Sequence, residues 1–536
     1  MSIPRSVAAV LKEHVTLEIE GIDRMYLNVY VPCLQRDGGV VSFFRFHLGH
    51  RFASSVLMDP ISKEFVVAME RFANEQQIPV VVLRKGERKD DIAAGHLKKF
   101  TGEEGVLFVG KAQEKTAVFR TERRRNEKTG ATYPWLVRST AMVNHFYVYC
   151  VDRDFGPFFL KFCSYFPYNA KLCINGNEWA KRQAAKAGIG FTPLDNGFAS
   201  CDDPARLQRI CNRLSAAKID ALLRKWLKRL PHPFTPADRT AGYRYDISIL
   251  QAEFSLTQML DRPLSGRVVF EEIIRENLDI GCPDKIGLVF DRKRRVDRRT
   301  PGRFRTRILT EGVIPSLHVD YKHSKIKQYH KEGKALRTET TINDSRDFGI
   351  GKRLCNLPAL AQVGFTANRR LLDVERLTSD PTIGDQAFRA VADPVIVGAQ
   401  RTSGLPFDSA RTQALLTALV VFRLLPNGFR NADLRAHLAP LLGLDPSHLT
   451  QGRMTYDLRR LRLHGLIERK PGTHRYTVTD LGLRTALFLT RVHSRLIQTG
   501  LSDLLDEQAV PTPIRRNLDR FTESVDQLIR ELNLAA

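Results

Sequence analysis

The chain has 536 residues, of which 43% are hydrophobic, and it carries a formal net charge of +24. This length predicts about three domains, and the apolar fraction is that of ordinary folded proteins. A positive charge of this size predicts a polyanionic partner, because nucleic acids attract clustered Lys and Arg side chains.

Two further features narrow the class of protein. Residues 1–15 have no signal-peptide core, and no apolar run reaches the ~20 residues that a membrane-spanning helix needs. The eight cysteines are scattered along the chain, without the close pairs of a zinc site. We therefore expect a cytoplasmic protein with no membrane partner, whose thiols are reduced and mostly structural.

Residues 1–140 are predicted to form an α/β domain. Strand-like stretches at 15–31, 78–86 and 104–115 alternate with a helix-like stretch at 60–77, which favours a sheet with helices packed on it. The basic run 120–134 is expected to form an exposed hairpin or linker. Four acidic residues near strand ends could form a metal-dependent nuclease centre, or lie in solvated loops: Asp23, Asp90, Asp91 and Glu114.

Residues 141–395 are predicted to form a central α+β domain. Residues 143–152 and 155–176 are rich in aromatic residues at strand-like spacing, and 177–188, 205–230 and 250–279 have helical patterns. Aromatic side chains interleaved with Lys and Arg could stack unpaired bases, or could form a core beneath a basic helix. The candidates are Phe146, Tyr147, Tyr149, Phe162, Tyr165 and Phe166.

A basic arm follows residue 291. Nine Arg or Lys residues occur between 292 and 307, interrupted by Pro301 and Gly302. Such a density is typical of a segment that contacts phosphates; a solvated surface loop is the alternative. The predicted nucleic-acid contacts in this arm are Arg292, Arg294, Arg295, Arg298, Arg299, Arg303 and Arg305.

Residues 316–344 concentrate side chains suited to chemistry. Residues 316–321 and 336–342 both have strand patterns, and 322–334 is expected to be a short helix or tight connection. His318 and Asp320 share one strand face, and so do Arg337 and Glu339, because side chains two apart point the same way. If the two strands are neighbours, His318, Asp320 and Glu339 could bind Mg²⁺ or Mn²⁺. The alternative is a polar sheet face with ion pairs.

The same segment predicts roles in phosphodiester cleavage. Tyr329 or a metal-bound water would be the nucleophile, and Lys331 and Arg337 would stabilise the phosphate charge. A tyrosine nucleophile would leave a covalent link to DNA, whereas a water would leave none.

Residues 396–536 are predicted to be a DNA-binding domain with further C-terminal helices, joined by a linker at 392–411. Helical patterns at 408–422, 431–443 and 447–470 precede a hairpin at 471–480. This order, and the run YDLRRLRLHGLIERKPGTHRYTVTDLG, resemble the winged helix-turn-helix superfamily over roughly 408–495. The resemblance implies a groove-facing helix carrying Arg453, Thr455, Tyr456, Arg459 and Arg460, and a wing carrying His474 and Arg475. The alternative is a winged helix used for protein contacts or dimerisation.

Two further resemblances concern the centre of the chain. The run IKQYHKEGKALRTETTI resembles a segment of rolling-circle replication initiators, which use a His-hydrophobic-His strand for a metal and a tyrosine to attack DNA. The matching strand here is His318-Val319-Asp320, with Asp in place of the second His. The central half also resembles uncharacterised bacterial proteins of the kind carried on mobile elements.

Together these features predict an α/β multidomain protein with a C-terminal winged helix that binds DNA. The expected function is replication, transposition or endonuclease chemistry on a mobile element. The alternatives are a non-catalytic DNA-binding regulator and an RNA-binding protein that uses the aromatic middle of the chain.

Overall fold

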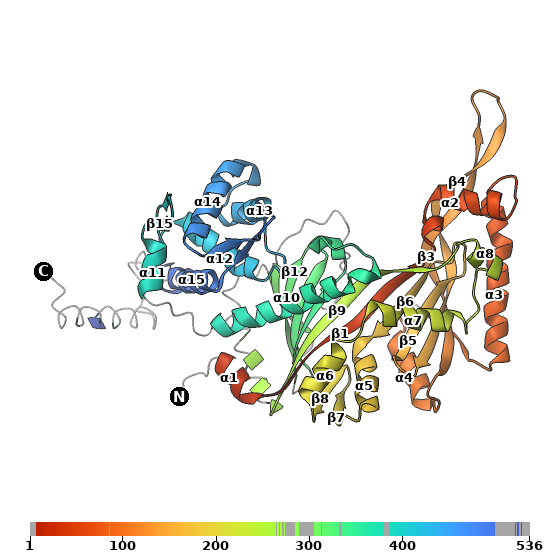
Figure 1. Cartoon of the computed structure of the whole chain (residues 1–536), viewed down its shortest axis with the longest axis horizontal. Helices are drawn as coiled ribbons and strands as arrows, with labels where there is room; N and C mark the ends of the chain where they lie inside the picture. The colour runs from red at the N-terminus through yellow and green to blue at the C-terminus, as the bar shows by residue number, and fades with distance from the viewer. Residues whose placement is uncertain are drawn as a thin grey trace.

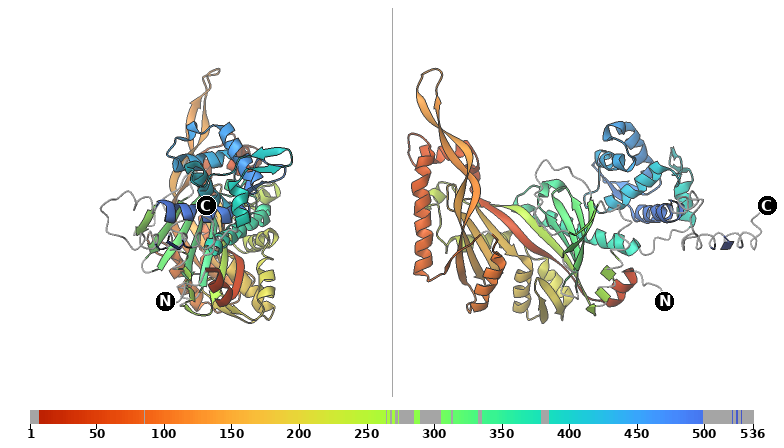
Figure 2. Two further views of the ribbon diagram at one scale, coloured as in Figure 1. Left: turned by 90° about the vertical axis from the view of Figure 1, so that its left-hand side faces the viewer. Right: turned by 180° about the vertical axis from the view of Figure 1, so that it is seen from behind.

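The computed structural model describes residues 7–84, 86–263, 265–266, 269–270, 273, 285–288, 305–311, 314–331, 335–378, 385–498, 520, 523–524 and 527. It consists of a long, twisted sheet with helices on it and a smaller, mainly helical unit at one end (Figures 1 and 2). The expected mixed α/β class is confirmed.

One sheet of twelve strands runs through the described part of the chain in the order β10-β11-β12-β13-β14-β9-β1-β6-β5-β4-β3-β2. The strands are β1 (Val15–Tyr30), β2 (Val80–Val82), β3 (Gly105–Arg125), β4 (Thr132–Asp152), β5 (Gly156–Cys163), β6 (Ala170–Asn175), β9 (Asp246–Leu260), β10 (Lys285–Leu288), β11 (Arg305–Glu311), β12 (Ile314–Tyr321), β13 (Ser324–Lys331) and β14 (Ala335–Ile342). β1 lies near the middle, paired with β6 on one side and with β9 on the other.

Three expectations about this region are wrong. The boundary expected between residues 140 and 141 falls inside β4, and the strands on either side of it share one sheet. The start of 250–279 is not helical but forms the end of β9, whose apolar Phe254 and Leu256 alternate with Ser255 and Thr257. Residues 324–331 are also a strand, β13, and not a helix or a tight connection.

Helices cover much of the sheet and bury its apolar side chains. They are α1 (Val7–His14), α2 (Asp37–Ser42), α3 (Met58–Glu75), α4 (Lys89–Lys99), α5 (Gly176–Lys186), α6 (Pro204–Cys211), α7 (Ala216–Leu227), α8 (Pro236–Thr240) and α10 (Leu357–Thr378), whereas α11 (Asp385–Ala392) lies in the smaller C-terminal unit (Figure 1). Phe65 of α3, Trp179 of α5 and Trp226 of α7 join Leu27 and Leu172 of the sheet in one core. Burial of these large side chains is the main contribution that holds the helices on the strands.

Short helical segments and a small hairpin complete this part. The segments are η1 (Pro32–Gln35), η2 (Phe43–His47), η3 (Ser55–Leu57), η4 (Ser345–Phe348) and η5 (Leu354–Asn356), and the hairpin is formed by β7 (Phe191–Leu194) and β8 (Gly197–Cys201). The turn of this hairpin places Asn196 over the sheet, where it contacts side chains of β1 and β14.

α10 joins the sheet through a buried polar contact as well as through apolar packing. The amide of Gln328 on β13 donates to the carboxyl group of Glu375 at 2.9 Å and to Thr338 at 3.1 Å. Burial raises the pKa of Glu375 to about 8, so this carboxyl group is mostly protonated at neutral pH.

The C-terminal unit has the predicted order of helix, helix, helix, hairpin and helix. Its elements are α12 (Ala410–Arg423), α13 (Asn431–Leu441), η6 (Pro446–His448), α14 (Gln451–Leu463), β17 (Ile467–Arg469), β18 (Tyr476–Val478), α15 (Asp480–Arg491) and η7 (Val492–Gln498). Thr450 and Thr479 cap α14 and α15 with their side-chain oxygens, which satisfies backbone N–H groups at both helix starts.

Residues 395–402 were expected to lie in a linker, but they form a hairpin of β15 (Val395–Val397) and β16 (Gln400–Thr402). The seven cysteines within the described residues are free thiols. Among the described residues, no helix has the length and apolar character required to cross a membrane.

Candidate nucleic-acid interface

The predicted metal ligands lie on strands that are not neighbours. β13 runs between β12 and β14, so Lys327 is paired with His318 on one side and with Glu339 on the other. At the usual strand spacing, the backbones of His318 and Glu339 are roughly 10 Å apart. The three paired residues project from the same face, which places a lysine in the row between the imidazole and the carboxylate. The prediction of adjacent strands is therefore wrong.

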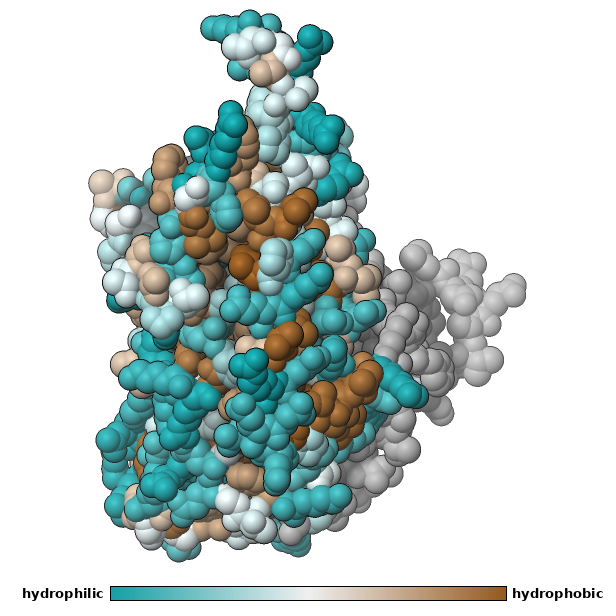
Figure 3. Space-filling model, turned by 90° about the vertical axis from the view of Figure 1, so that its right-hand side faces the viewer, coloured by the Kyte–Doolittle hydropathy of each residue, from teal (hydrophilic) through white to brown (hydrophobic). Residues whose placement is uncertain are grey.

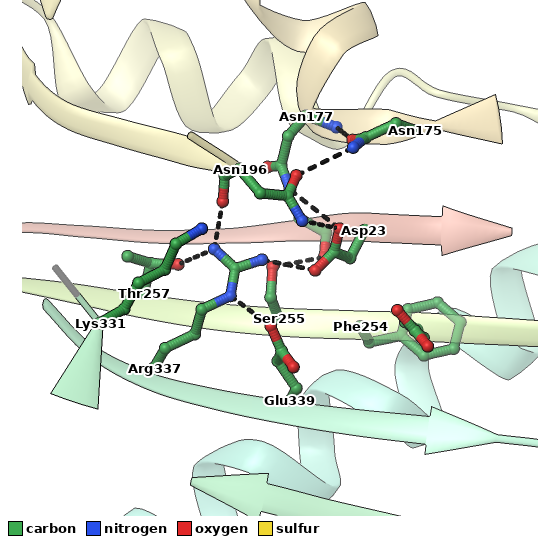
Figure 4. Close-up of polar contacts among 12 residues, drawn as sticks. Asp23, Asn175, Asn177, Asn196, Phe254, Ser255, Thr257, Lys331, Arg337 and Glu339 are labelled. Atoms are coloured by element: carbon green, nitrogen blue, oxygen red, sulfur yellow. Dashed lines mark hydrogen bonds and ion pairs between the residues drawn. The ribbon is translucent and has the colours of Figure 1, made fainter. Parts of the chain in front are cut away.

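Arg337 lies at the centre of a buried ion-pair cluster (Figure 4). Its side chain is 0% exposed and contacts Asp23 at 2.5 Å and Glu339 at 2.5 Å. It also donates to the hydroxyl of Thr257 at 3.2 Å and to the backbone carbonyl of Asn196. Burial alone would lower the pKa of Arg337, but the negative charges of Asp23 and Glu339 raise it above its ordinary value. The guanidinium is thus charged, fully paired and closed off from a phosphate.

The cluster extends to the loop residues above the sheet. Asn196 donates to the carboxylate of Asp23, and Asn177 at the start of α5 lies 3.5 Å from the same carboxylate. Asn175 donates to Asn196 at 3.0 Å. These contacts come from β1, β6, α5 and the β7–β8 turn (Figure 4). The cluster therefore ties the two halves of the sheet together, as buried polar networks do when each member has partners.

Tyr329 is held in the same cluster by its hydroxyl. It donates to Glu339 at 2.9 Å, and its ring lies 4.6 Å from the ammonium group of Lys327. Burial, together with the negative charge of Glu339, raises the pKa of Tyr329. A raised pKa keeps the phenol protonated, which opposes its use as a nucleophile. The predicted phosphate contact Lys331 lies 3.8 Å from Asp195, and its side chain is 12% exposed.

More acidic side chains than basic ones surround Arg337, and the pKa of one of these acids is raised. Burial, with the negative charges of Asp23 and Glu339, raises the pKa of Glu253 to about 7. The carboxyl group of Glu253 accepts a hydrogen bond from the side-chain amide of Gln251 at 2.9 Å. At neutral pH a partly protonated Glu253 lowers the repulsion among these carboxyl groups.

Neither proposed metal centre fits the arrangement. Glu339 already accepts from Arg337 and Tyr329, and the described residues contain no group of three or more His, Cys, Asp or Glu side chains placed to hold a metal ion. The acidic residues considered for a nuclease centre are also separated. Asp90 pairs with Arg24 at 3.7 Å, and Glu114 accepts from Lys161 and Tyr147, whose hydrogen bonds overcome burial and lower its pKa to about 2.

Five of the six aromatic residues considered for base stacking are buried. Phe146, Phe162 and Phe166 are 0–1% exposed and belong to the main core. Tyr147 and Tyr149 are 6% and 7% exposed. The alternative interpretation, an aromatic core, is therefore confirmed for these positions, because large rings on both strands and helices fill the same interior.

α14 presents a basic and polar face to the solvent. Met454, Asp457, Leu458 and Leu461 point inward, whereas Arg453, Thr455, Tyr456 and Arg459 are exposed. This division follows the helical period, since residues three and four apart share a face. The structure thus places four of the five predicted helix residues on one accessible surface, which we call the α14 face.

Arg460, the fifth predicted residue, has a different position. Its guanidinium donates to the carbonyl of Ser403 at 3.1 Å and also to the carbonyl of Gly404. His464 contacts the same Ser403 carbonyl at 2.9 Å and the carbonyl of Ala390 at 2.8 Å. These side chains anchor the segment after α11 to the flank of α14, so the prediction that Arg460 faces a groove is wrong.

The anchored segment forms one wall of a cavity beside the α14 face. The cavity has a volume of about 280 Å³. Its lining consists of Pro394, Arg401, Thr402, Ser403, Tyr456 and Arg459. Two arginines from separate elements therefore border one recess, an arrangement that could accept a phosphate oxygen. The sequence does not predict Arg401 as a nucleic-acid contact, because its position beside α14 depends on the anchoring of its segment by Arg460 and His464.

The two predicted wing residues differ in exposure. His474 is exposed, with its Nδ1 atom 3.3 Å from a guanidinium nitrogen of Arg469. Arg475 is half-buried and donates to the carbonyl of Gly428 at 3.1 Å, so part of its role is to hold the β17–β18 hairpin in place. The exposed basic side chains of this hairpin are those of Arg469 and His474.

Most of the predicted basic arm cannot be placed. Six of its predicted contacts lie outside the described residues: Arg292, Arg294, Arg295, Arg298, Arg299 and Arg303. The seventh, Arg305, is the first residue of β11.

No protein-family model, curated protein or solved structure matches the chain. A functional assignment therefore rests on the chain's own residues and their geometry.

Proposed function

We propose that the chain is a DNA-binding protein that contacts duplex DNA with the α14 face. The observation that carries this proposal is the cluster of exposed Arg453, Thr455, Tyr456 and Arg459 on one side of α14. An α-helix fits the major groove, where arginine can donate two hydrogen bonds to a guanine edge. The hydroxyl of Tyr456 adds a donor and an acceptor for bases or phosphates, whereas the hydroxyl of Thr455 donates to the carbonyl of Gln451 at 2.9 Å and helps to fix the helix face.

The surroundings of α14 support the same role. The element order of residues 410–491 supports the expected likeness to a winged helix, in which the β17–β18 hairpin would correspond to the wing and would carry the exposed His474. Arg401 borders the cavity beside α14, so it can contact the phosphate backbone of DNA next to the helix that contacts the bases. The net charge of +24 favours association with any polyanion and adds a salt-dependent contribution to affinity.

A non-catalytic DNA binder is favoured over an endonuclease. The groups expected to act on a phosphodiester are instead engaged with one another, since Arg337 and Tyr329 both contact Glu339. We propose no reaction step through a divalent metal at residues 316–345. A role on a mobile element stays a prediction from the resemblances.

The experiment is a selection of bound duplexes from a random pool, followed by affinity measurements on the recovered site. Arg453→Gln or Arg459→Gln should weaken binding to that site roughly 5- to 150-fold if the lost contact is a bidentate base contact. Arg484→Gln is the matched control, because Arg484 is exposed on α15 and not on the α14 face. Equal affinities for all four proteins would assign the α14 face to protein contacts.

The salt dependence of the same complex gives a second measurement. If six phosphates are contacted, the logarithm of the affinity should fall with the logarithm of salt concentration at a slope of about −5. A response that stays flat between low and physiological salt would remove the polyanion argument based on net charge.

A further inference from the structure

The β3–β4 hairpin extends well beyond the body of the molecule. β3 and β4 are each 21 residues long, and their far end projects past α2 and α3 (Figures 1 and 2). We call residues 120–138 the distal hairpin. Figure 3 shows this projection mainly in the hydrophilic to intermediate colours, so its surface is largely polar.

The distal hairpin is a regular element and not a loose loop. Backbone pairing continues without interruption to Arg125 and Thr132. In the turn, the side chain of Asn126 accepts from the backbone N–H groups of Lys128 and Thr129, and Gly130 has a φ of +69°. Asn and Gly are the residues that favour such turns. The side chains of the two strands are therefore held at fixed positions.

The base of the hairpin is fixed by one of its two faces. Phe119 and Leu136 are buried in the main core, and the backbone N–H of Ser55 donates to the hydroxyl of Thr121 at 2.7 Å. Because strand side chains alternate between faces, this anchoring decides which residues point outward from the other face.

The outward face combines aromatic rings with arginine. Trp135 is paired with Glu122, and Tyr133 is paired with Arg124. Trp135 is 44% exposed, and the guanidinium of Arg124 lies 4.7 Å from its ring centroid. The rings of Tyr133 and Trp135 are 6.3 Å apart at an angle of 81°. An exposed indole flanked by arginine and tyrosine is the composition that stacks unpaired bases.

Positive charge surrounds these rings. The distal hairpin carries six cations, Arg120, Arg123, Arg124, Arg125, Lys128 and Arg138, and two carboxylates, Glu122 and Glu127. Within the described residues, the cations paired with a carboxylate are Arg120, with Glu122 at 2.6 Å, and Arg138, with Asp37 at 3.0 Å. Of the four cations between them, Arg124 lies on the face of Trp135 and Lys128 lies in the turn, whereas Arg123 and Arg125 lie on the opposite face, where Arg125 donates to the carbonyl of Gly130 at 3.2 Å.

We propose that the distal hairpin binds single-stranded nucleic acid, with a base stacked on Trp135 and phosphates held by Arg124 on the same face and by Lys128 in the turn. A single strand fits better than a duplex, because bases in a duplex are stacked on one another and do not offer a free ring face. This site is separate from the α14 face, so the proposal does not depend on duplex binding there.

The three tryptophans of the chain make a direct test possible. Trp179 and Trp226 are each 2% exposed, so Trp135 is the tryptophan that a bound base can reach. A single-stranded DNA or RNA 12-mer of mixed sequence should quench the fluorescence of the full chain. Fluorescence anisotropy of the labelled 12-mer then measures binding independently of tryptophan.

Variants separate stacking from charge. Trp135→Phe should lose the quenching and keep most of the affinity, whereas Trp135→Ala should weaken binding roughly 5- to 150-fold, as expected for the loss of one stacked base. The double variant Arg124→Gln/Lys128→Gln should make the log–log salt slope shallower by about 1.4. Arg453→Gln/Arg459→Gln should leave the quenching unchanged, which distinguishes this site from the α14 face.

Three results would overturn the proposal. They are binding of the 12-mer with no change in tryptophan fluorescence, unchanged affinity in Trp135→Ala, and stronger quenching by a blunt duplex or by anionic lipid vesicles than by the 12-mer. The thermal unfolding curve of each variant should match that of the parent protein, because Trp135, Arg124 and Lys128 are exposed.

Discussion

Replacing Arg337 with methionine would remove the one buried cation of the cluster and leave its acids in place. The side chain of Asp23 is 2% exposed, so its charge would be left in the interior without a cation. Loss of one partner from a buried ion pair typically costs about 3–5 kcal/mol. The hydrogen bonds from Arg337 to Thr257 and Asn196 would be lost as well, which places the expected destabilisation in the upper part of that range.

Thermal unfolding followed by far-UV circular dichroism measures the effect. At 2–4 °C per kcal/mol for domains of 150–250 residues, a cost of about 4–5 kcal/mol means that Arg337→Met should lower the Tm by roughly 8–20 °C, and a larger sheet unit should respond at the lower end. The double variant Asp23→Asn/Arg337→Met should lose less than the sum of the two single variants, because the uncompensated charge is gone. DNA affinity at a temperature where the variant is folded should be unchanged.

The opposite pattern would refute this interpretation of Arg337. If Arg337→Met kept its Tm within about 2 °C and lost DNA affinity, the guanidinium would be a phosphate contact and not a structural cation. Additive Tm changes in the double variant would show that Asp23 and Arg337 do not depend on each other.

Two further predictions concern other buried contacts. The pKa of Glu375 is raised to about 8 from 4.5, so between these pH values the folded protein holds a proton that the unfolded chain releases, and stability should fall as pH rises from about 4.5 to 8. Glu375→Gln should therefore raise the Tm more at pH 9 than at pH 6. Parallel curves of Tm against pH for the two proteins would contradict this. Arg460→Ala should release the β15–β16 hairpin from α14, because it removes the hydrogen bonds to the carbonyls of Ser403 and Gly404. Trypsin should then cut after Arg401 faster in Arg460→Ala than in an Arg459→Ala control. Equal cleavage rates would argue against the anchor.

Local patterns predicted the elements that have a clear apolar period of their own, whether their partners in the fold are near or distant. The strand expected at 15–31 is β1, the helix expected at 60–77 is α3 within two residues, and the helix expected at 177–188 is α5. The C-terminal order of elements is also confirmed, since short connections keep each helix beside its predecessor. These segments carry clear apolar periods and capping residues, which are local signals.

Two strands with weak patterns of their own are not predicted by the sequence. The pattern at 250–279 predicts a helix, but β9 lies between β1 and β14, which supply its hydrogen bonds from far along the chain. The sequence predicts a connection where β13 lies, because its lysines and histidine hide the alternation of Ser324, Ile326 and Gln328. Tertiary context overrides local propensity in such strands.

The candidate site shows the same limit. The shared face of Arg337 and Glu339 was predicted correctly, because it depends on the strand period alone. Their ion pair was not, and the contact with Asp23 joins residues 314 positions apart. The exposed face of α14 was predictable from its helical period, whereas the capture of Arg460 by Ser403 required the fold of the preceding segment.

The position of β1 has a consequence for how the chain is made. One edge of β1 is covered by β9, and the hydrogen bond from Ser255 to Gly21 spans 234 positions. At translation rates of about 5–20 residues per second, β1 leaves the ribosome roughly 12–47 s before that partner strand does. During this interval the nascent chain presents an open strand edge, the kind of surface that pairs with other chains. Fragments that end before β9 should accordingly aggregate during synthesis, and the interval gives a chaperone time to bind.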